Sequence, residues 1–224
     1  MIELKNVNKV FEDGHRVLTD INIKIEKGEF VFLVGSSGAG KSTLIKLLLK
    51  ETEATSGKII INEREITSLR RRDIPYHRRH IGCVFQDFRL LPNKTVYENV
   101  AFAMEVVEAS PREIRKQVPL VLSMVGLTRK SKLYPHQISG GEQQRASLAR
   151  AMVNGPAILI ADEPTGNLDP EMSMDIMRML NEFNYRGTTI LMATHEKEIV
   201  NTMKKRVIAL ENGMVSRDQI RGAY

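Results

Sequence analysis

The chain has 224 residues, which suits one large domain or a domain that carries an inserted lobe. Hydrophobic residues make up 42% and charged residues 27% of the chain, as in an ordinary globular protein, and its single cysteine, Cys83, excludes an internal disulfide. The formal net charge of +6 permits anionic partners such as nucleotide, nucleic acid or an acidic membrane surface, but a modestly basic surface explains it equally well.

The sequence shows no pattern for export and none for a membrane-spanning helix. The first residues, 1–5, lack a signal-peptide pattern, and no apolar run approaches the ~20 residues of a membrane helix. We therefore expect a cytosolic chain without a transmembrane segment of its own, which touches a membrane only through another protein.

Residues 1–34 alternate between apolar and polar positions, which predicts strands. The apolar run 30–34 ends this stretch, leucines at helical spacing follow in 41–50, and 57–61 predicts another strand. From about residue 87 to 150 the pattern becomes helical. Ser110, Pro111 and Glu113 form a helix-start signal, and Pro119 is expected to kink or shorten that helix.

The last third of the chain predicts strands at 157–161, 188–193 and 206–210, with helices near 171–184 and 196–203 between them. Strand and helix in alternation favour a mostly parallel sheet covered on both faces. We predict a single α/β domain. Residues 1–86 and 151–224 form its nucleotide-binding core, and the helical residues 87–150 form an inserted subdomain.

A glycine-rich loop follows the run 30–34 and precedes a helix, which is the context of a P-loop. Its backbone N–H groups and the helix N-terminus attract phosphate oxygens. Lys41 is expected on the β- and γ-phosphates of ATP, and the Ser42 hydroxyl on Mg²⁺. The nucleotide-binding candidates are Gly35, Ser36, Ser37, Gly38, Ala39, Gly40, Lys41, Ser42 and Thr43.

Two acids follow the apolar strand 157–161. Ligands of α/β sheets gather at the carboxyl ends of the strands, so Asp162 should lie near the P-loop and hold Mg²⁺. Glu163 is the candidate general base that polarises the attacking water.

The run Ser139-Gly140-Gly141-Glu142-Gln143-Gln144-Arg145 completes a set of motifs that resembles the ATP-binding subunits of ABC transporters. The resemblance covers essentially the whole chain and implies a P-loop NTPase core with an N-terminal antiparallel β subdomain. Glu142 stands where the commonest signature has Gln, which leaves the detailed signature contacts open.

The resemblance also implies roles for single residues. Phe11 would stack on adenine, Gln86 would reach Mg²⁺ and the water, and His195 would contact the γ-phosphate. Asp169 would lie at a dimer interface. The signature residues Ser139, Gly140, Gly141 and Glu142 would clasp ATP bound to an opposing subunit.

Ser139 precedes a helical run, so the chain contains a second anion-binding helix start besides the P-loop. Two such starts for one ATP in one chain would be redundant. A homodimer formed on ATP binding explains both, because the P-loop of one copy would then face the signature of the other.

Within the family, residues 85–92 and 95–100 resemble the bacterial cell-division branch. That branch implies an integral membrane partner of the FtsX type and a peripheral place on the cytoplasmic face of the cell membrane at the septum. Lipoprotein-release and macrolide-export ATPases are the alternative within the family. A soluble ABC ATPase that acts on nucleic acid or ribosomes is disfavoured, because its usual coiled-coil insertion or second ATPase half is missing, and no direct nucleic-acid contact is expected.

The basic stretch 68–80 has two interpretations, which the sequence leaves open: contact with anionic lipid or the membrane partner, or a solvated charged edge.

Overall fold

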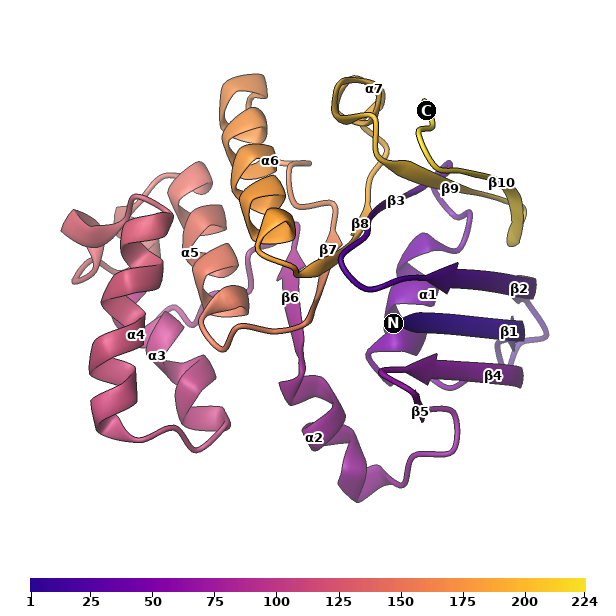
Figure 1. The fold of residues 1–224 in the computed structure, drawn as a ribbon, viewed down its shortest axis with the longest axis horizontal. Coiled ribbons are helices and arrows are strands. Elements are labelled where there is room, and N and C mark those ends of the chain that lie inside the picture. The colour runs from indigo at the N-terminus through magenta and orange to yellow at the C-terminus, as the bar shows by residue number, and fades with distance from the viewer. The chain divides into compact units, whose positions relative to one another are not determined.

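The computed structural model describes residues 1–224, which form two compact units (Figure 1). Met1–Arg78 and Thr189–Tyr224 make up the first unit, and Arg79–Thr188 make up the second. No helix in the structure is both long enough and apolar enough to cross a membrane.

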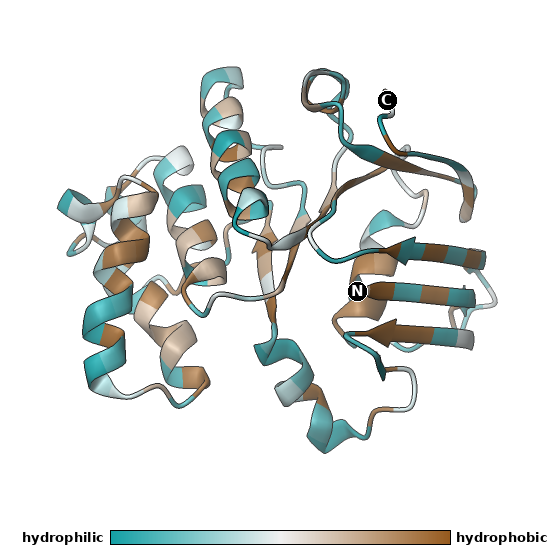
Figure 2. Ribbon diagram, viewed as in Figure 1, coloured by the Kyte–Doolittle hydropathy of each residue, from teal (hydrophilic) through white to brown (hydrophobic).

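An antiparallel sheet occupies the N-terminal part of the first unit. Its strands pair in the order β2-β1-β4-β5. Apolar and polar residues alternate along β1, β2 and β4 (Figure 2), so one face of the sheet is buried while the other meets water. The strands are β1 (Ile2–Val10), β2 (Arg16–Ile25), β4 (Ser56–Ile61) and β5 (Arg64–Glu65).

A mostly parallel set of strands forms the rest of the first unit. β3 pairs in parallel with β8 on one side and β9 on the other, and β10 is antiparallel to β9. Every residue of β3 and β8 is buried, which explains why their sequences are continuous apolar runs. The strands are β3 (Phe30–Val34), β8 (Thr189–Ala193), β9 (Arg206–Glu211) and β10 (Met214–Gln219).

The helices of this part of the chain are short. α1 (Lys41–Leu48) buries four apolar side chains and lies beside the antiparallel sheet (Figure 1). α7 (Lys197–Met203) follows β8, and the turn η1 (Arg71–Asp73) leads into α2 (Ile74–Arg79).

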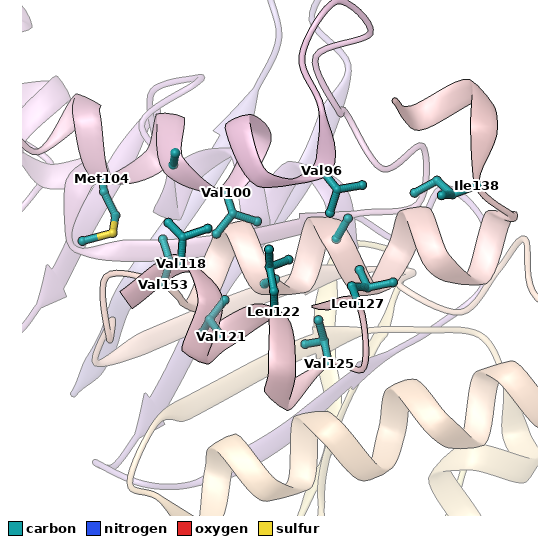
Figure 3. Close-up of a cluster of buried hydrophobic side chains, with 13 residues drawn as sticks. Val96, Val100, Met104, Val118, Val121, Leu122, Val125, Leu127, Ile138 and Val153 are labelled. Atoms are coloured by element: carbon teal, nitrogen blue, oxygen red, sulfur yellow. The ribbon is translucent and has the colours of Figure 1, made fainter. Parts of the chain in front are cut away.

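The second unit contains the parallel pair β6 (Ile81–Phe85) and β7 (Ile158–Asp162). An apolar cluster fixes α3, α4 and α5 to one another, with Val100, Val118 and Ala149 among its fully buried members (Figure 3). Burial of each such side chain contributes about 1.5–3 kcal/mol for valine-sized and larger residues. The helices are α3 (Val96–Val106), α4 (Pro111–Met124), α5 (Gly140–Met152) and α6 (Pro170–Tyr185), with short turns η2 (Thr128–Lys130) and η3 (Pro135–Gln137).

The start of α4 agrees with the sequence prediction, and its end lies beyond Pro119. Ser110 caps it in a capping box with Glu113, and Pro111 takes the first helical position. The sequence predicts that Pro119 kinks or shortens the helix, and the shortening does not occur, because α4 continues to Met124. Pro119 faces solvent, while Val121 and Leu122 in the following turn are buried in the apolar cluster and hold that turn helical.

Parallel pairing at β3–β8, β3–β9 and β6–β7, with an antiparallel N-terminal sheet, confirms the α/β fold class.

Candidate nucleotide-binding site

The predicted P-loop connects β3 to α1 in the first unit. Gly35 has φ 149° and Gly40 has φ 104°, both in the region that favours glycine. A Cβ on Gly40 would come within 2.6 Å of the buried Leu18 Cδ2, and one on Gly35 would overlap the carbonyl oxygen of Leu210. The loop therefore depends on glycine at both positions, as a backbone that must pass close to phosphate requires.

Lys41 is buried, and its ammonium lies within the curve of this loop. Its Nζ donates to the carbonyl oxygen of Gly35 at 2.7 Å and to that of Ser36 at 3.1 Å. The Ser42 hydroxyl is exposed beside it. No acid stands in the first turn of α1 and no side chain caps it, so the helix start presents its N–H groups to an incoming anion.

Phe11 and His195 also belong to the first unit, and both are exposed. Phe11 is 41% exposed, so it does not pack in the core, and Lys9 Nζ lies 4.9 Å from its ring centroid. His195 follows β8 directly, after the buried Thr194. Both side chains are accessible to a ligand.

Gln86 directly follows β6 in the second unit and is paired with Asn167. Gln86 Nε2 donates to Asn167 Oδ1 at 3.2 Å, and Asn167 Nδ2 donates to the Gln86 carbonyl at 3.2 Å. This double contact joins the loop after β6 to the loop after β7. The pairing was not predicted from the sequence, because 81 residues separate its members.

The two acids lie at the end of β7, as predicted. Asp162 is the last strand residue, and Glu163 has φ 49°, a left-handed conformation that is costly for a non-glycine residue. Such strain concentrates at functional sites, where the surrounding structure holds it. The predicted approach of Asp162 to the P-loop joins residues of the two units, and it stays a prediction.

Ser139 caps α5 and arranges its first turn. Ser139 Oγ accepts the N–H of Glu142 at 3.3 Å, and the Glu142 carboxylate accepts the N–H of Ser139 at 3.0 Å. Of the four N–H groups that a helix start leaves without an intrahelical partner, those of Gly140 and Gly141 remain open. The signature therefore forms a second helix start with open N–H groups, as predicted, and its binding of an anion stays a prediction.

Asp169 is the N-cap of α6, where its carboxylate accepts the N–H of Met172 at 2.9 Å. This role was not predicted and comes in addition to the expected one at a dimer interface. The local signal for it, Asp followed by Pro170 at the first helical position, was present in the sequence.

The basic stretch 68–80 is partly accounted for within the protein. Arg78 donates to the carbonyls of Leu49 and Lys50, Arg70 pairs with Asp73, and Arg79 pairs with Glu108. These three guanidinium groups thus have structural contacts, whereas Arg71 and Arg72 are exposed, and both interpretations of the stretch stay open.

The oxygen donors of these elements fit Mg²⁺, which prefers hydroxyl and carboxylate oxygens. Ser42 supplies a hydroxyl, Gln86 an amide oxygen and Asp162 a carboxylate. No group of three or more His, Cys, Asp or Glu side chains forms a separate metal site.

Known proteins resemble this chain over its whole length. The family description "ABC transporter" matches residues 18–166. The cell division ATP-binding protein FtsE of Bacillus subtilis strain 168 is 55% identical over 224 residues, which is 100% of this chain and 98% of that protein. FtsE of Escherichia coli K12 is 46% identical over 213 residues, covering 95% of this chain and 96% of that protein.

A solved structure agrees with the fold. The ATP-binding cassette MJ0796, described as dimeric, post-hydrolysis and bound to ADP and Pi, superimposes with a TM-score of 0.89 at 35% identity, over 100% of both chains. The glycine loop, the capped signature helix and these similarities lead to one assignment: the chain belongs to the ABC transporter family.

Proposed function

We propose that this chain is the ATP-hydrolysing subunit of a membrane complex of the cell-division type. The observation that supports ATP hydrolysis most directly is the loop 35–43, where Lys41 lies buried inside a backbone curve that only glycine permits. The relatives named FtsE support the cell-division role, because they match the chain over nearly their full length.

In the proposed reaction, water attacks the γ-phosphorus of ATP and the bond from that phosphorus to the ADP oxygen breaks. Lys41 neutralises charge on the β- and γ-phosphates, and Glu163 accepts the proton of the water. Mg²⁺, held by Ser42 with Asp162 and Gln86, would offset further phosphate charge. Gln86 and His195 orient the water and the γ-phosphate, and Phe11 stacks on adenine.

A second copy would complete the site. The loop Gly35–Thr43 of one copy binds ATP, and Ser139, Gly140 and Gly141 of the other copy donate to its γ-phosphate, with Glu142 shaping that helix start. Asp169 lies at the contact between the copies. The open N–H groups of Gly140 and Gly141 support this assignment, as does the dimeric state of MJ0796.

Glu163→Gln tests the proposed base. The amide accepts no proton, so turnover should fall at least about 100-fold while ATP stays bound and the dimer accumulates. Glu105→Gln, the same change at an exposed position of α3, is the matched control and should hydrolyse ATP at the parent rate. Unchanged turnover in Glu163→Gln would refute Glu163 as the base.

The membrane partner is proposed to be an integral protein of the FtsX type that docks on the loop after Gln86. That loop is well defined: Arg150 donates to the carbonyls of Phe88 and Arg89, and the Arg89 guanidinium lies 3.7 Å from the Phe85 ring centroid. Its exposed Asp87 and Arg89 offer charge to a partner.

Co-purification from membranes tests this partner and the peripheral location at the septum. The chain should be recovered with a four-span membrane protein of the division site, and Arg89→Glu should reduce the recovery more than Arg112→Glu at the exposed start of α4. Stable pairing only with a lipoprotein-release partner would contradict the cell-division role and favour the alternative branch.

A further inference from the structure

An acid lies at the point where the signature helix would meet phosphate. Glu142 is the third residue of α5, in the same first turn as the N–H groups of Gly140 and Gly141. A carboxylate there would repel the γ-phosphate of ATP, whereas the Gln of the commonest signature carries no charge.

The Glu142 carboxylate is paired with a cation and with a backbone N–H. Its Oε1 accepts Lys130 Nζ at 2.5 Å, and its Oε2 accepts the N–H of Ser139 at 3.0 Å. Arg145 is a weaker second cation, 3.8 Å from Oε1. The Glu142 side chain is 14% exposed, so this pair is screened less than a surface ion pair.

Lys130 is brought to this place by a turn that is itself fixed. The Lys130 N–H donates to the Leu127 carbonyl and its own carbonyl accepts the N–H of Leu133, both at 3.0 Å. Leu127 is fully buried in the apolar cluster around α3, α4 and α5. The Lys130 backbone is therefore fixed near the start of α5, where its ammonium reaches the Glu142 carboxylate.

The capping box also leaves Ser139 ready to donate. Its Oγ accepts the N–H of Glu142, so its hydroxyl hydrogen can point outward to an anion. This arrangement requires the Glu142 carboxylate to remain on the Ser139 backbone, which Lys130 secures.

We propose that Lys130 is a positioning residue of the signature: it cancels the charge of Glu142 and holds that carboxylate on Ser139, so that the helix start can bind the phosphate of ATP from a second copy. The proposal rests on the proposed function, in which the signature of one copy clasps the ATP of another.

The test measures the ATP concentration that converts half of the chain into a dimer, by sedimentation, with Glu163→Gln as the parent. The variants are Lys130→Met, Lys130→Arg, Glu142→Gln and the double variant Lys130→Met/Glu142→Gln. Lys132→Met is the matched control, because Lys132 is exposed and lies two residues away. Thermal unfolding checks that each variant is folded. The Lys130 side chain is 43% exposed, so its replacement should not prevent folding.

Lys130→Met should raise the required ATP concentration about tenfold, because the Glu142 carboxylate then keeps only the Ser139 N–H and the more distant Arg145 as partners. Lys130→Arg and Lys132→Met should stay within about twofold of the parent. Glu142→Gln should be impaired less than Lys130→Met, because it removes the charge that Lys130 cancels. The double variant should return to the Glu142→Gln level, since without the negative charge Lys130 has nothing to cancel.

Three results would overturn the proposal. If Lys130→Met and Lys132→Met require the same ATP concentration, Lys130 has no role. If Glu142→Gln requires as much ATP as Lys130→Met, the link between η2 and α5 is purely structural. If the double variant requires as much ATP for dimerisation as Lys130→Met, Lys130 does not act through Glu142. If the parent binds ATP but never dimerises, the proposed clasp itself is refuted, and with it the proposed role of Lys130.

Discussion

At the scale of single residues, the P-loop depends on a missing Cβ at Gly35. Gly35→Ala should lower the free energy of unfolding by about 1–3 kcal/mol and weaken ATP binding, because its Cβ would overlap the Leu210 backbone oxygen at a positive φ. Urea unfolding and ATP titration measure the two effects.

Gly14→Ala is the control for this change. Gly14 has φ 82° with nothing near its Cβ, so the variant carries only the cost of the backbone conformation, about 1 kcal/mol, and should keep its ATP affinity. Equal ATP affinity in Gly35→Ala and Gly14→Ala would contradict the close approach at Gly35.

The Lys130–Glu142 pair should also make the stability of the protein depend on pH. The hydrogen bond from Lys130, with help from the Ser139 N–H, lowers the pKa of Glu142 below its ordinary value. A lowered folded-state pKa means that the stability contributed by the ionised group is present above the unfolded-state pKa and is lost as pH falls through the folded-state pKa.

Wild-type chain should therefore be more stable than Glu142→Gln near pH 7, and the difference should shrink as pH falls through the acid range below about 4.5. Urea unfolding of both proteins across this range measures it. Carboxyl-carbon NMR should show the pKa of Glu142 rise in Lys130→Met; an unchanged pKa would mean that the ion pair is not formed in solution.

At the scale of elements, Arg150 ties the signature helix to the loop after Gln86. Its Nη1 donates to the Arg89 carbonyl at 2.5 Å and its Nη2 to the Phe88 carbonyl at 2.9 Å. Phe88 and Arg89 are held at φ 59° and 47°, conformations that non-glycine residues rarely adopt.

Arg150→Met should lower the free energy of unfolding by about 2 kcal/mol and speed hydrogen exchange of the Phe88 and Arg89 amides, because two carbonyls lose their donor. Arg150→Lys keeps the charge but not the planar fork, and should give an intermediate result. Exchange that is equally slow in all three proteins would show that the turn is stable without Arg150.

The sequence predicted those elements whose signals are local. The P-loop, the cap at Ser110 and the buried strands β3 and β8 follow from residues next to one another in the chain. The end of α4 does not follow from local signals, because burial of Val121 and Leu122 against distant helices overrides the local effect of Pro119.

Contacts between distant residues were beyond prediction for the same reason. Lys130 and Glu142 are 12 residues apart, Phe88 and Arg150 are 62 apart, and Gln86 and Asn167 are 81 apart. No helical or strand period links such pairs. The candidate residues were therefore identified from motifs, while the partners that position them appeared only in the structure.

At the scale of the whole molecule, one chain carries two helix starts suited to phosphate, one after Gly40 and one after Ser139. We propose that these two starts serve the same ATP from different copies of the chain. ATP binding would then bring two copies together and hydrolysis would let them separate, which would give a membrane partner a motion to use.

Mixing two defective copies tests this claim most directly. One copy carries Lys41→Ala and the other Ser139→Arg, both with Glu163→Gln, and sedimentation reports dimers with and without ATP. Neither copy alone should dimerise on ATP, but the mixture should, because the intact loop of the second copy meets the intact signature of the first. A mixture that stays as monomeric as its components, while copies without these two changes dimerise, would contradict a site shared between copies.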